Sequence, residues 1–259
     1  MSSDRNDEGG RAVMQVLTTD LDVVTWSGAL ARLSAWAARR DSRVVCITNV
    51  HSVVTARSDA NFQRVLQEAD LVTPDGAPVA WMMRRLGARG QERINGPDLM
   101  LKYCELAAQR GEPMYFYGST PQTLEKLKVA LQARFPGLVV AGAYSPPFRA
   151  LSAQEDEAIV EAINGSGART VWVGLGCPKQ ETWMAAHRGR IHAVMVGVGA
   201  AFDYHAGTIQ RAPLWMQRHG LEWLHRLCSE PGRLWRRYLF TNTAFVLGAA
   251  RQWLFGQPR

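Results

Sequence analysis

The stretch Gly-Leu-Gly-Cys-Pro-Lys-Gln-Glu, residues 174–181, combines residue types that can bind an anion. A short β-branched run precedes it and Pro178 suits the first turn of a helix, so the pattern predicts a strand, a glycine turn and a helix N-terminus. Backbone N–H groups at such a turn can bind a phosphate or a carboxylate, and Gln180 and Glu181 could reach the same ligand. The glycines are equally consistent with a tight turn that serves only the backbone.

A second candidate is Asp75, which follows a predicted strand in the segment Thr-Pro-Asp-Gly, residues 73–76. A carboxylate at the end of a strand could act as a general base and take a proton from an acceptor hydroxyl. The same four residues also form a favoured turn sequence. Without further support, the turn is the preferred interpretation.

Two more segments offer groups that bind ligands. Arg93 lies beside a loop glycine and a helix start, where it could bind an anion, whereas Asp98 suits the first helical turn. Thr48 and Asn49 provide short hydrogen-bonding side chains at the end of a predicted strand. Either of them could instead cap the helix that follows.

Residue patterns that would hold a metal are weak in this chain. Asp20-Leu-Asp22 has the DxD pattern that holds a divalent metal on a nucleotide diphosphate in many transferases, but it lies near the N-terminus and predicts a solvated turn. The six histidines are scattered, and the four cysteines show no CxxC or Cys/His clustering, which argues against a zinc site and a disulfide framework. We therefore expect no metal, no cofactor, and reduced thiols in a cytoplasmic protein.

These segments need a scaffold that brings them together. Short β-branched runs alternate with segments of helical period over residues 11–206, which predicts a Rossmann-like, mostly parallel sheet with helices on both faces. Strands are expected at residues 13–17, 44–48, 71–73, 114–117, 138–141, 170–173 and 193–196. Helices are expected at residues 26–39, 61–69, 77–86, 97–110, 121–135, 153–164 and 178–188.

Five of the predicted strands end in polar or glycine turns. In open α/β sheets, ligands bind beyond the carboxyl ends of the strands, so we expect all five turns at one rim. The turns are residues 48–49, 75–76, 118–119, 174–176 and 197–199. We therefore expect a single site built from residues that are far apart in the sequence.

After about Gly207 the alternation stops, and residues 207–259 read as a helical appendage rich in arginine and tryptophan. It carries eight arginines against two acidic residues, so most of the net charge of +7 lies there. Interleaved cations and aromatics could bind single-stranded nucleic acid, lie on an anionic membrane, fold over a diphosphate or form a solvated helical face. Apolar residues at 245–247 and 253–255 favour the membrane over nucleic acid.

The composition of the chain also bears on its N-terminal tail, on membrane spans and on its domain organisation. The first ten residues hold almost no apolar side chains, which predicts a disordered tail. We expect no signal peptide, because Met1 is followed by polar residues, and no apolar run reaches the roughly 18 residues of a spanning helix. We therefore expect an α/β catalytic core over residues 11–206 and a membrane-associating appendage over residues 207–259.

Taken together, the segments resemble the WecG/TagA/CpsF family of bacterial glycosyltransferases (glycosyltransferase family 26), from about residue 13 to residue 238. The most specific motifs are Gly174-x-Gly-x-Pro-Lys-Gln-Glu-x-Trp183, Gly197-x-Gly-x-x-Phe-Asp203, Arg211-Ala-Pro-x-Trp215, Gly220-Leu-Glu-Trp-x-x-Arg226-Leu and Glu230-Pro-x-Arg233. The resemblance implies an inverting, metal-independent enzyme that moves a hexose-type sugar from a UDP-sugar to an undecaprenyl-diphosphate-linked sugar. It would act in surface or exopolysaccharide biosynthesis, peripherally on the cytoplasmic face of the cell membrane.

The resemblance also implies roles for single residues. The family's proposed catalytic aspartate matches Asp75, and its active-site threonine, arginine and glutamine match Thr48, Arg93 and Gln180. The appendage would complete the site, with Arg226, Arg233 and Arg236 as participants. The other candidates are Asn49, Asn95 and Glu181 for substrate, and Gly118, Gly174, Gly176, Gly199 and Asp203 for the nucleotide. N-acetylmannosamine, its uronic acid and glucose are all donors within the family, and the sequence does not choose among them.

Two other functions stay open. An NAD(P)-dependent oxidoreductase would use the glycine turns, but it predicts a full GxGxxG, and Lys179 occupies the third glycine position. A non-enzymatic membrane-surface adaptor would need only the appendage. The partners expected are a UDP-sugar donor, a polyprenyl-diphosphate-sugar acceptor and the anionic inner-membrane surface. No nucleic acid is expected, and a homo-oligomer is left open.

Overall fold

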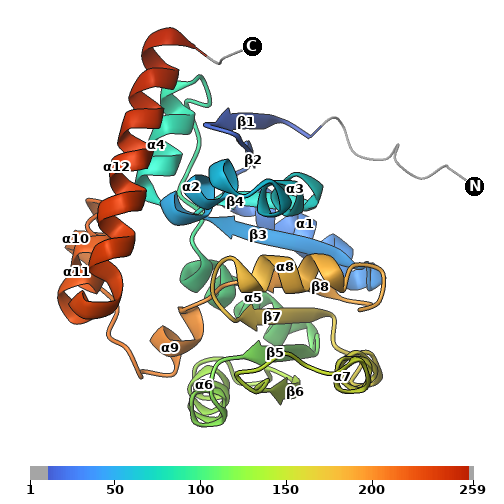
Figure 1. Ribbon diagram of the computed structural model, residues 1–259. Coiled ribbons are helices and arrows are strands. Elements are labelled where there is room, and N and C mark those ends of the chain that lie inside the picture. The colour runs from blue at the N-terminus through green and yellow to red at the C-terminus, as the bar shows by residue number, and fades with distance from the viewer. Residues whose placement is uncertain (1–10, 257–259) are drawn as a thin grey trace, which may run out of the picture.

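Six parallel strands form the central sheet of the computed structural model, which describes residues 11–256 (Figure 1). Their order across the sheet is β4-β3-β8-β7-β5-β6. The strands are β3 (Arg43–Thr48), β4 (Leu71–Pro74), β5 (Met114–Gly118), β6 (Val140–Tyr144), β7 (Thr170–Gly174) and β8 (Val194–Gly197). The predicted α/β class with a parallel sheet is confirmed. The tail expected at residues 1–10 lies outside the described residues.

Helices cover both faces of this sheet, and the strands therefore alternate between two apolar layers. In β3, Val44 and Cys46 join one layer and Val45 and Ile47 join the other. Such strands read as continuous apolar runs because neither face meets water. One layer includes α2 (Val50–Ser58), α3 (Ala60–Glu68), α4 (Ala77–Arg85), α7 (Ala153–Gly165) and α8 (Lys179–Ala186). The other includes α1 (Trp26–Arg39), α5 (Gly96–Arg110), α6 (Pro121–Arg134) and α9 (Ala201–His205).

An antiparallel hairpin of β1 (Val13–Val16) and β2 (Thr19–Asp22) lies beside β4 and corrects one sequence prediction. Asp22 does not lie in a solvated turn but in β2, with a fully buried side chain. Its carboxylate accepts hydrogen bonds from the Arg11 Nε atom at 2.7 Å and from the Val72 N–H at 2.6 Å. These charged and backbone donors offset the cost of burying the carboxylate, so the residue serves the fold.

The C-terminal appendage consists of α10 (Leu214–Arg218), α11 (Glu222–Ser229) and α12 (Pro231–Phe255). In Figure 1, α12 is the long red helix that runs past α2 and α4 at one side of the sheet. Phe245 and Ala249 on α12 are buried against the core, and the Gln252 side chain hydrogen bonds to the backbone of Leu17 at 2.8 Å. Helix α12 is thus packed on the core. Among the described helices, none is long and apolar enough to cross a membrane.

Candidate active site

A cavity of about 810 Å³ opens at the carboxyl ends of β3, β4, β7 and β8, between the core and the appendage. Four of the five predicted turns border it. They contribute, among the predicted residues, Asn49, Asp75, Gly174, Gly176 and Gly199. Residues that lie 150 positions apart in the sequence, Asn49 and Gly199, thus meet at one cavity, as the strand ends predict.

The fifth turn, at Gly118, lies outside this cavity lining and serves the sheet. Gly118 has a φ of 118°, and a Cβ atom there would lie 2.7 Å from the backbone of Gly174. The Ser119 N–H then donates to the Gly174 carbonyl at 3.2 Å. The structure therefore gives Gly118 a packing reason for being glycine, because any side chain would collide with β7.

Asp75 lies one residue beyond β4, where its N–H donates to the Thr48 carbonyl at 2.9 Å. Its side chain is 24% exposed and lines the cavity. The Arg93 Nε atom donates to the Asp75 carbonyl, and the Arg93 Nη2 atom lies 3.5 Å from the Asp75 carboxylate. Burial raises the pKa of Asp75, and the Arg93 charge opposes that rise. A carboxylate with a raised pKa is a better proton acceptor than a solvated one, which suits a general base.

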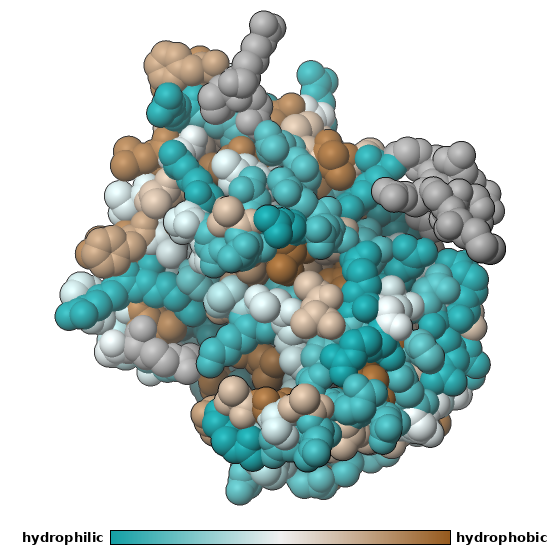
Figure 2. Space-filling model, turned by 45° about the vertical axis from the view of Figure 1, so that its right-hand side comes forward, coloured by the Kyte–Doolittle hydropathy of each residue, from teal (hydrophilic) through white to brown (hydrophobic). Residues whose placement is uncertain are grey.

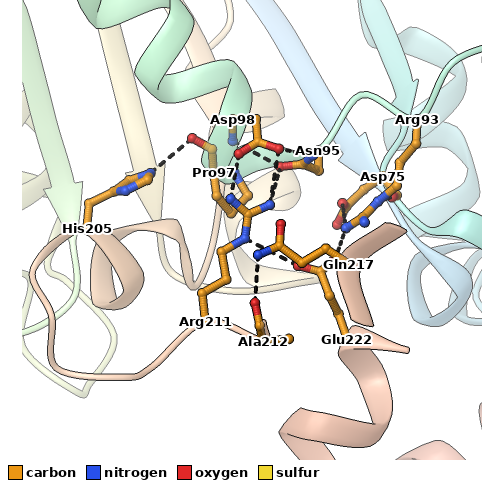
Figure 3. Close-up of polar contacts among 10 residues, drawn as sticks. All are labelled: Asp75, Arg93, Asn95, Pro97, Asp98, His205, Arg211, Ala212, Gln217 and Glu222. Carbon is orange, nitrogen blue, oxygen red and sulfur yellow. Dashed lines mark hydrogen bonds and ion pairs between the residues drawn. The ribbon is translucent and has the colours of Figure 1, made fainter. Parts of the chain in front are cut away.

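Arg93 also reaches the appendage, through a chain of ion pairs drawn in Figure 3. Its Nη2 atom donates to Glu222 at the start of α11, and Glu222 accepts from the Arg211 Nε atom at 3.3 Å. The Arg211 Nη2 atom donates in turn to Asp98 at 3.1 Å and to Asn95 at 3.3 Å. Asn95, a predicted substrate contact, lies outside the cavity lining and caps α5.

Gln180 lines the cavity, and both the oxygen and the nitrogen of its side-chain amide form hydrogen bonds within the protein. Its Oε1 atom accepts the Gly176 N–H at 3.1 Å, and its Nε2 atom donates to the Glu181 carboxylate at 3.0 Å. The Gly176 N–H, which we expected to face a ligand, is therefore occupied. One hydrogen of the Gln180 amide remains for a ligand, in an orientation that these two bonds fix.

Glu181 does not reach the cavity as predicted, because its side chain is buried in the core. Its Oε2 atom has no hydrogen-bond partner among the described residues. Burial raises the pKa of Glu181 to about 7, although the bond from Gln180 opposes that shift. Glu181 is thus a buried carboxyl that orients the Gln180 side chain by accepting a hydrogen bond from its amide nitrogen.

Thr48 and Asn49, at the end of β3, take different positions. Thr48 is buried beside Pro74 of β4 and lies outside the cavity lining. Asn49 lines the cavity and also caps α2, since its Oδ1 atom accepts the His51 N–H at 2.9 Å. The capping interpretation therefore holds for Asn49. Its amide nitrogen stays available to a ligand.

The appendage contributes two arginines to the cavity, Arg226 and Arg237. Arg236, which was predicted, is instead exposed and lies over the Trp235 ring at 5.2 Å, and the Arg233 side chain is outside the described part of the structure. Arg237 could have been predicted from the helical period of α12, because Arg237 lies on the same face as the other residues of α12 that line the cavity. Those residues are Leu234, Tyr238, Thr241, Asn242, Phe245 and Val246.

The two arginines bring positive charge to the cavity, whose lining also holds Arg93 and the carboxylates of Asp75, Asp203 and Glu222. Within residues 11–256, neither Arg226 nor Arg237 forms an ion pair with a carboxylate, and the Nε atom of each is buried without a hydrogen-bond partner. Burial and the Arg237 charge lower the pKa of His51, in the same cavity, to about 4. Asp203 also lines the cavity and accepts a hydrogen bond from Thr208 at 3.2 Å. Unpaired guanidinium groups in a cavity suit a diphosphate.

This fold and site are those of an α/β enzyme with a candidate base and a candidate anion-binding pocket at one sheet edge. The chain belongs to the WecG/TagA/CpsF family of glycosyl transferases, whose model matches residues 14–259, and this confirms the resemblance seen in the motifs. Membership in a family of transferases sets aside both the oxidoreductase and the non-enzymatic adaptor.

Two characterised relatives are similar over most of their length. Both are named N-acetylglucosaminyldiphosphoundecaprenol N-acetyl-beta-D-mannosaminyltransferase. The protein from Bacillus spizizenii is 33% identical over 185 residues, which cover 71% of this chain and 70% of the relative. The protein from Bacillus subtilis is 30% identical over 197 residues, which cover 76% and 75% respectively.

Proposed function

We propose that this protein is an inverting glycosyltransferase that moves a sugar from a UDP-sugar to a sugar on undecaprenyl diphosphate. The observation that carries this proposal is one cavity that holds the Asp75 carboxylate together with Arg226 and Arg237. The names of the two relatives support a lipid-diphosphate acceptor and make N-acetylmannosamine the first donor sugar to test. The product would enter a surface polysaccharide or an exopolysaccharide.

In the proposed reaction, Asp75 takes the proton of the acceptor hydroxyl as that oxygen attacks the anomeric carbon. The bond from this carbon to the diphosphate oxygen breaks, and UDP leaves from the opposite face. A single displacement inverts the anomeric centre and needs no second carboxylate as nucleophile. The charge that develops on the leaving diphosphate is stabilised by Arg226 and Arg237, which lie in the same cavity.

The arginines would take the place that a divalent metal has on the diphosphate in other transferases. The DxD-like segment supports this part of the proposal, because the Asp22 carboxylate is bound by Arg11 and Arg32 and lies outside the cavity lining. On the donor side, Gln180 and the glycine turns after β7 and β8 would contact the UDP-sugar. Asp203 and Asn49 lie at the same cavity and would contribute hydrogen bonds.

We further propose that α12 holds the enzyme on the anionic inner face of the cell membrane. Apolar side chains project along the side of the molecule where α12 runs (Figure 2). These exposed residues are Leu239, Phe240, Val246, Leu247, Trp253, Leu254 and Phe255. Apolar side chains beside an excess of arginine are typical of a helix that lies in the interface of an anionic bilayer.

Sedimentation with anionic liposomes tests the membrane proposal. The variant Phe240→Ser/Leu247→Ser removes two exposed apolar side chains from one face of α12, so it should sediment less than the wild type. Val129→Ser, an equally exposed site on α6, is the matched control and should sediment normally. Equal sedimentation of all three proteins would contradict membrane binding through α12.

A panel of UDP-sugars with a synthetic polyprenyl-diphosphate-N-acetylglucosamine tests the reaction itself. We expect one donor to give a lipid-linked disaccharide by mass spectrometry, with the anomeric configuration opposite to that of the donor. Calorimetry should detect UDP binding and no NADH binding. A protein that binds NADH but no UDP-sugar would overturn the proposal.

A further inference from the structure

Glu222 is the only carboxylate that the described part of the appendage places in the cavity lining, and the proposed chemistry does not use it. It is the first residue of α11, and its side chain is 20% exposed. Figure 3 shows it pointing from the appendage toward Arg93 and Arg211. It accepts a hydrogen bond from each of these arginines.

The Arg93 guanidinium is shared between two carboxylates. Its Nη2 atom contacts Glu222 closely and lies 3.5 Å from the nearer oxygen of Asp75, which is beyond a good hydrogen bond. Because Glu222 accepts the hydrogen bond from Nη2 and its charge repels the Asp75 carboxylate, Glu222 opposes the stabilisation of ionised Asp75 by Arg93. The charges act in opposite directions: Glu222 raises the pKa of Asp75, whereas Arg93 and Arg211 lower it.

Without Glu222, the guanidinium would be free to pair fully with Asp75. Its Nε atom donates to the Asp75 carbonyl, and its Nη2 atom, at 3.5 Å from the Asp75 carboxylate, could then close on that oxygen. A charge-assisted hydrogen bond of this kind would stabilise the ionised carboxylate and reduce its basicity. The acceptor hydroxyl would then lose its proton acceptor.

We propose that Glu222 is a positioning residue that draws Arg93 away from Asp75 and so keeps the base free for the acceptor hydroxyl. The inference rests on the proposed role of Asp75. It makes the base dependent on the appendage, because Glu222 reaches Arg93 only while α11 is seated on the core. The site is thus completed from two distant parts of the chain.

Other charged and titratable groups also face the Asp75 site. Those whose charges act on Asp75, or on Tyr204 of α9 beside it, come from the loop before α5, the segment before α10, α11 and α12. They are Arg93, Arg211, Glu222, Arg226 and Tyr238. Arg211 also donates a hydrogen bond to Asp98 at 3.1 Å. This contact between the appendage and the core does not depend on Glu222.

The variant Glu222→Gln tests this inference, since glutamine keeps the shape and one acceptor oxygen but removes the charge. We expect kcat to fall about tenfold at neutral pH and the acidic limb of the kcat/KM profile to move to lower pH, with UDP affinity retained. Glu125→Gln, an exposed pair partner of Lys128 on α6, should leave both unchanged. An unmoved acidic limb would overturn the inference, whether or not the rate falls.

A second measurement needs no turnover. The carboxyl 13C signal of Asp75, followed against pH by NMR, should titrate at lower pH in Glu222→Gln than in the wild type. This result separates the two proposals, because an inactive wild type would refute the proposed reaction but leave this titration measurable. Identical Asp75 titrations in both proteins would refute the role of Glu222.

Discussion

Glu181 gives a stability prediction whose size follows from its burial. Its pKa is raised from 4.5 to about 7, because the carboxyl lies in the core and its Oε2 atom has no partner among the described residues. Between these two pH values the unfolded chain has released this proton while the folded protein keeps it. Stability therefore falls as pH rises through this window, by roughly 3 kcal/mol once the folded carboxyl is ionised.

The variant Glu181→Gln removes this pH-dependent cost. Its amide oxygen can still accept the hydrogen bond from Gln180 that Glu181 accepts at 3.0 Å. Any steric cost of the new amide is the same at all pH values, so the pH dependence of the difference is the measurement of interest.

Urea unfolding of both proteins at pH 5 and pH 8 measures this difference. Relative to the wild type, the free energy of unfolding of Glu181→Gln should be higher at pH 8 than at pH 5 by about 3 kcal/mol. Glu125→Gln, which is exposed, should show no such change. If Glu181→Gln gains nothing between pH 5 and pH 8, the burial argument for Glu181 is wrong.

Three further variants test the cavity and the sheet. Arg226→Ala and Arg237→Ala should each slow transfer by about 10²- to 10³-fold, because each removes a cation from the leaving diphosphate. Arg236→Ala, on the exposed side of α12, should stay near the wild-type rate, and equal losses in all three would contradict the assignment. Gly118→Ala should cost a few kcal/mol in urea unfolding, since its Cβ would lie 2.7 Å from backbone, and wild-type stability would refute this. Gly165→Ala, with open space around it, is the control.

Most of the sheet could be predicted because its strands are buried on both faces and end in recognisable turns. Helix α2 was missed because its sequence, Val-His-Ser-Val-Val-Thr-Ala-Arg-Ser, is rich in β-branched residues of low helix propensity. The Asn49 cap and packing against α12 hold it as a helix. A contact with residues 180 positions away overrides local preference, and no local pattern reports it.

Only part of the site could be predicted, because some of its residues are brought together only by contacts between distant parts of the chain. Asp75, Gln180 and the glycine turns could be located because each follows a strand. Glu222 could not, because a single acid in a basic tail reads as a solvated charge until α11 is seen beside Arg93. Arg236 and Arg237 are neighbours in the sequence, but neighbouring side chains leave a helix in different directions. The Arg236 side chain is therefore exposed, whereas the Arg237 side chain lines the cavity.

Turnover of Asp75→Asn tests the central claim most directly. With the active UDP-sugar and a synthetic polyprenyl-diphosphate-sugar, the variant should lose about 10²- to 10⁴-fold in kcat, because asparagine cannot accept the proton. Its affinity for UDP by calorimetry should stay within a few-fold of the wild type, since Arg226, Arg237 and Gln180 are unchanged. Transfer by Asp75→Asn at the wild-type rate would contradict the account.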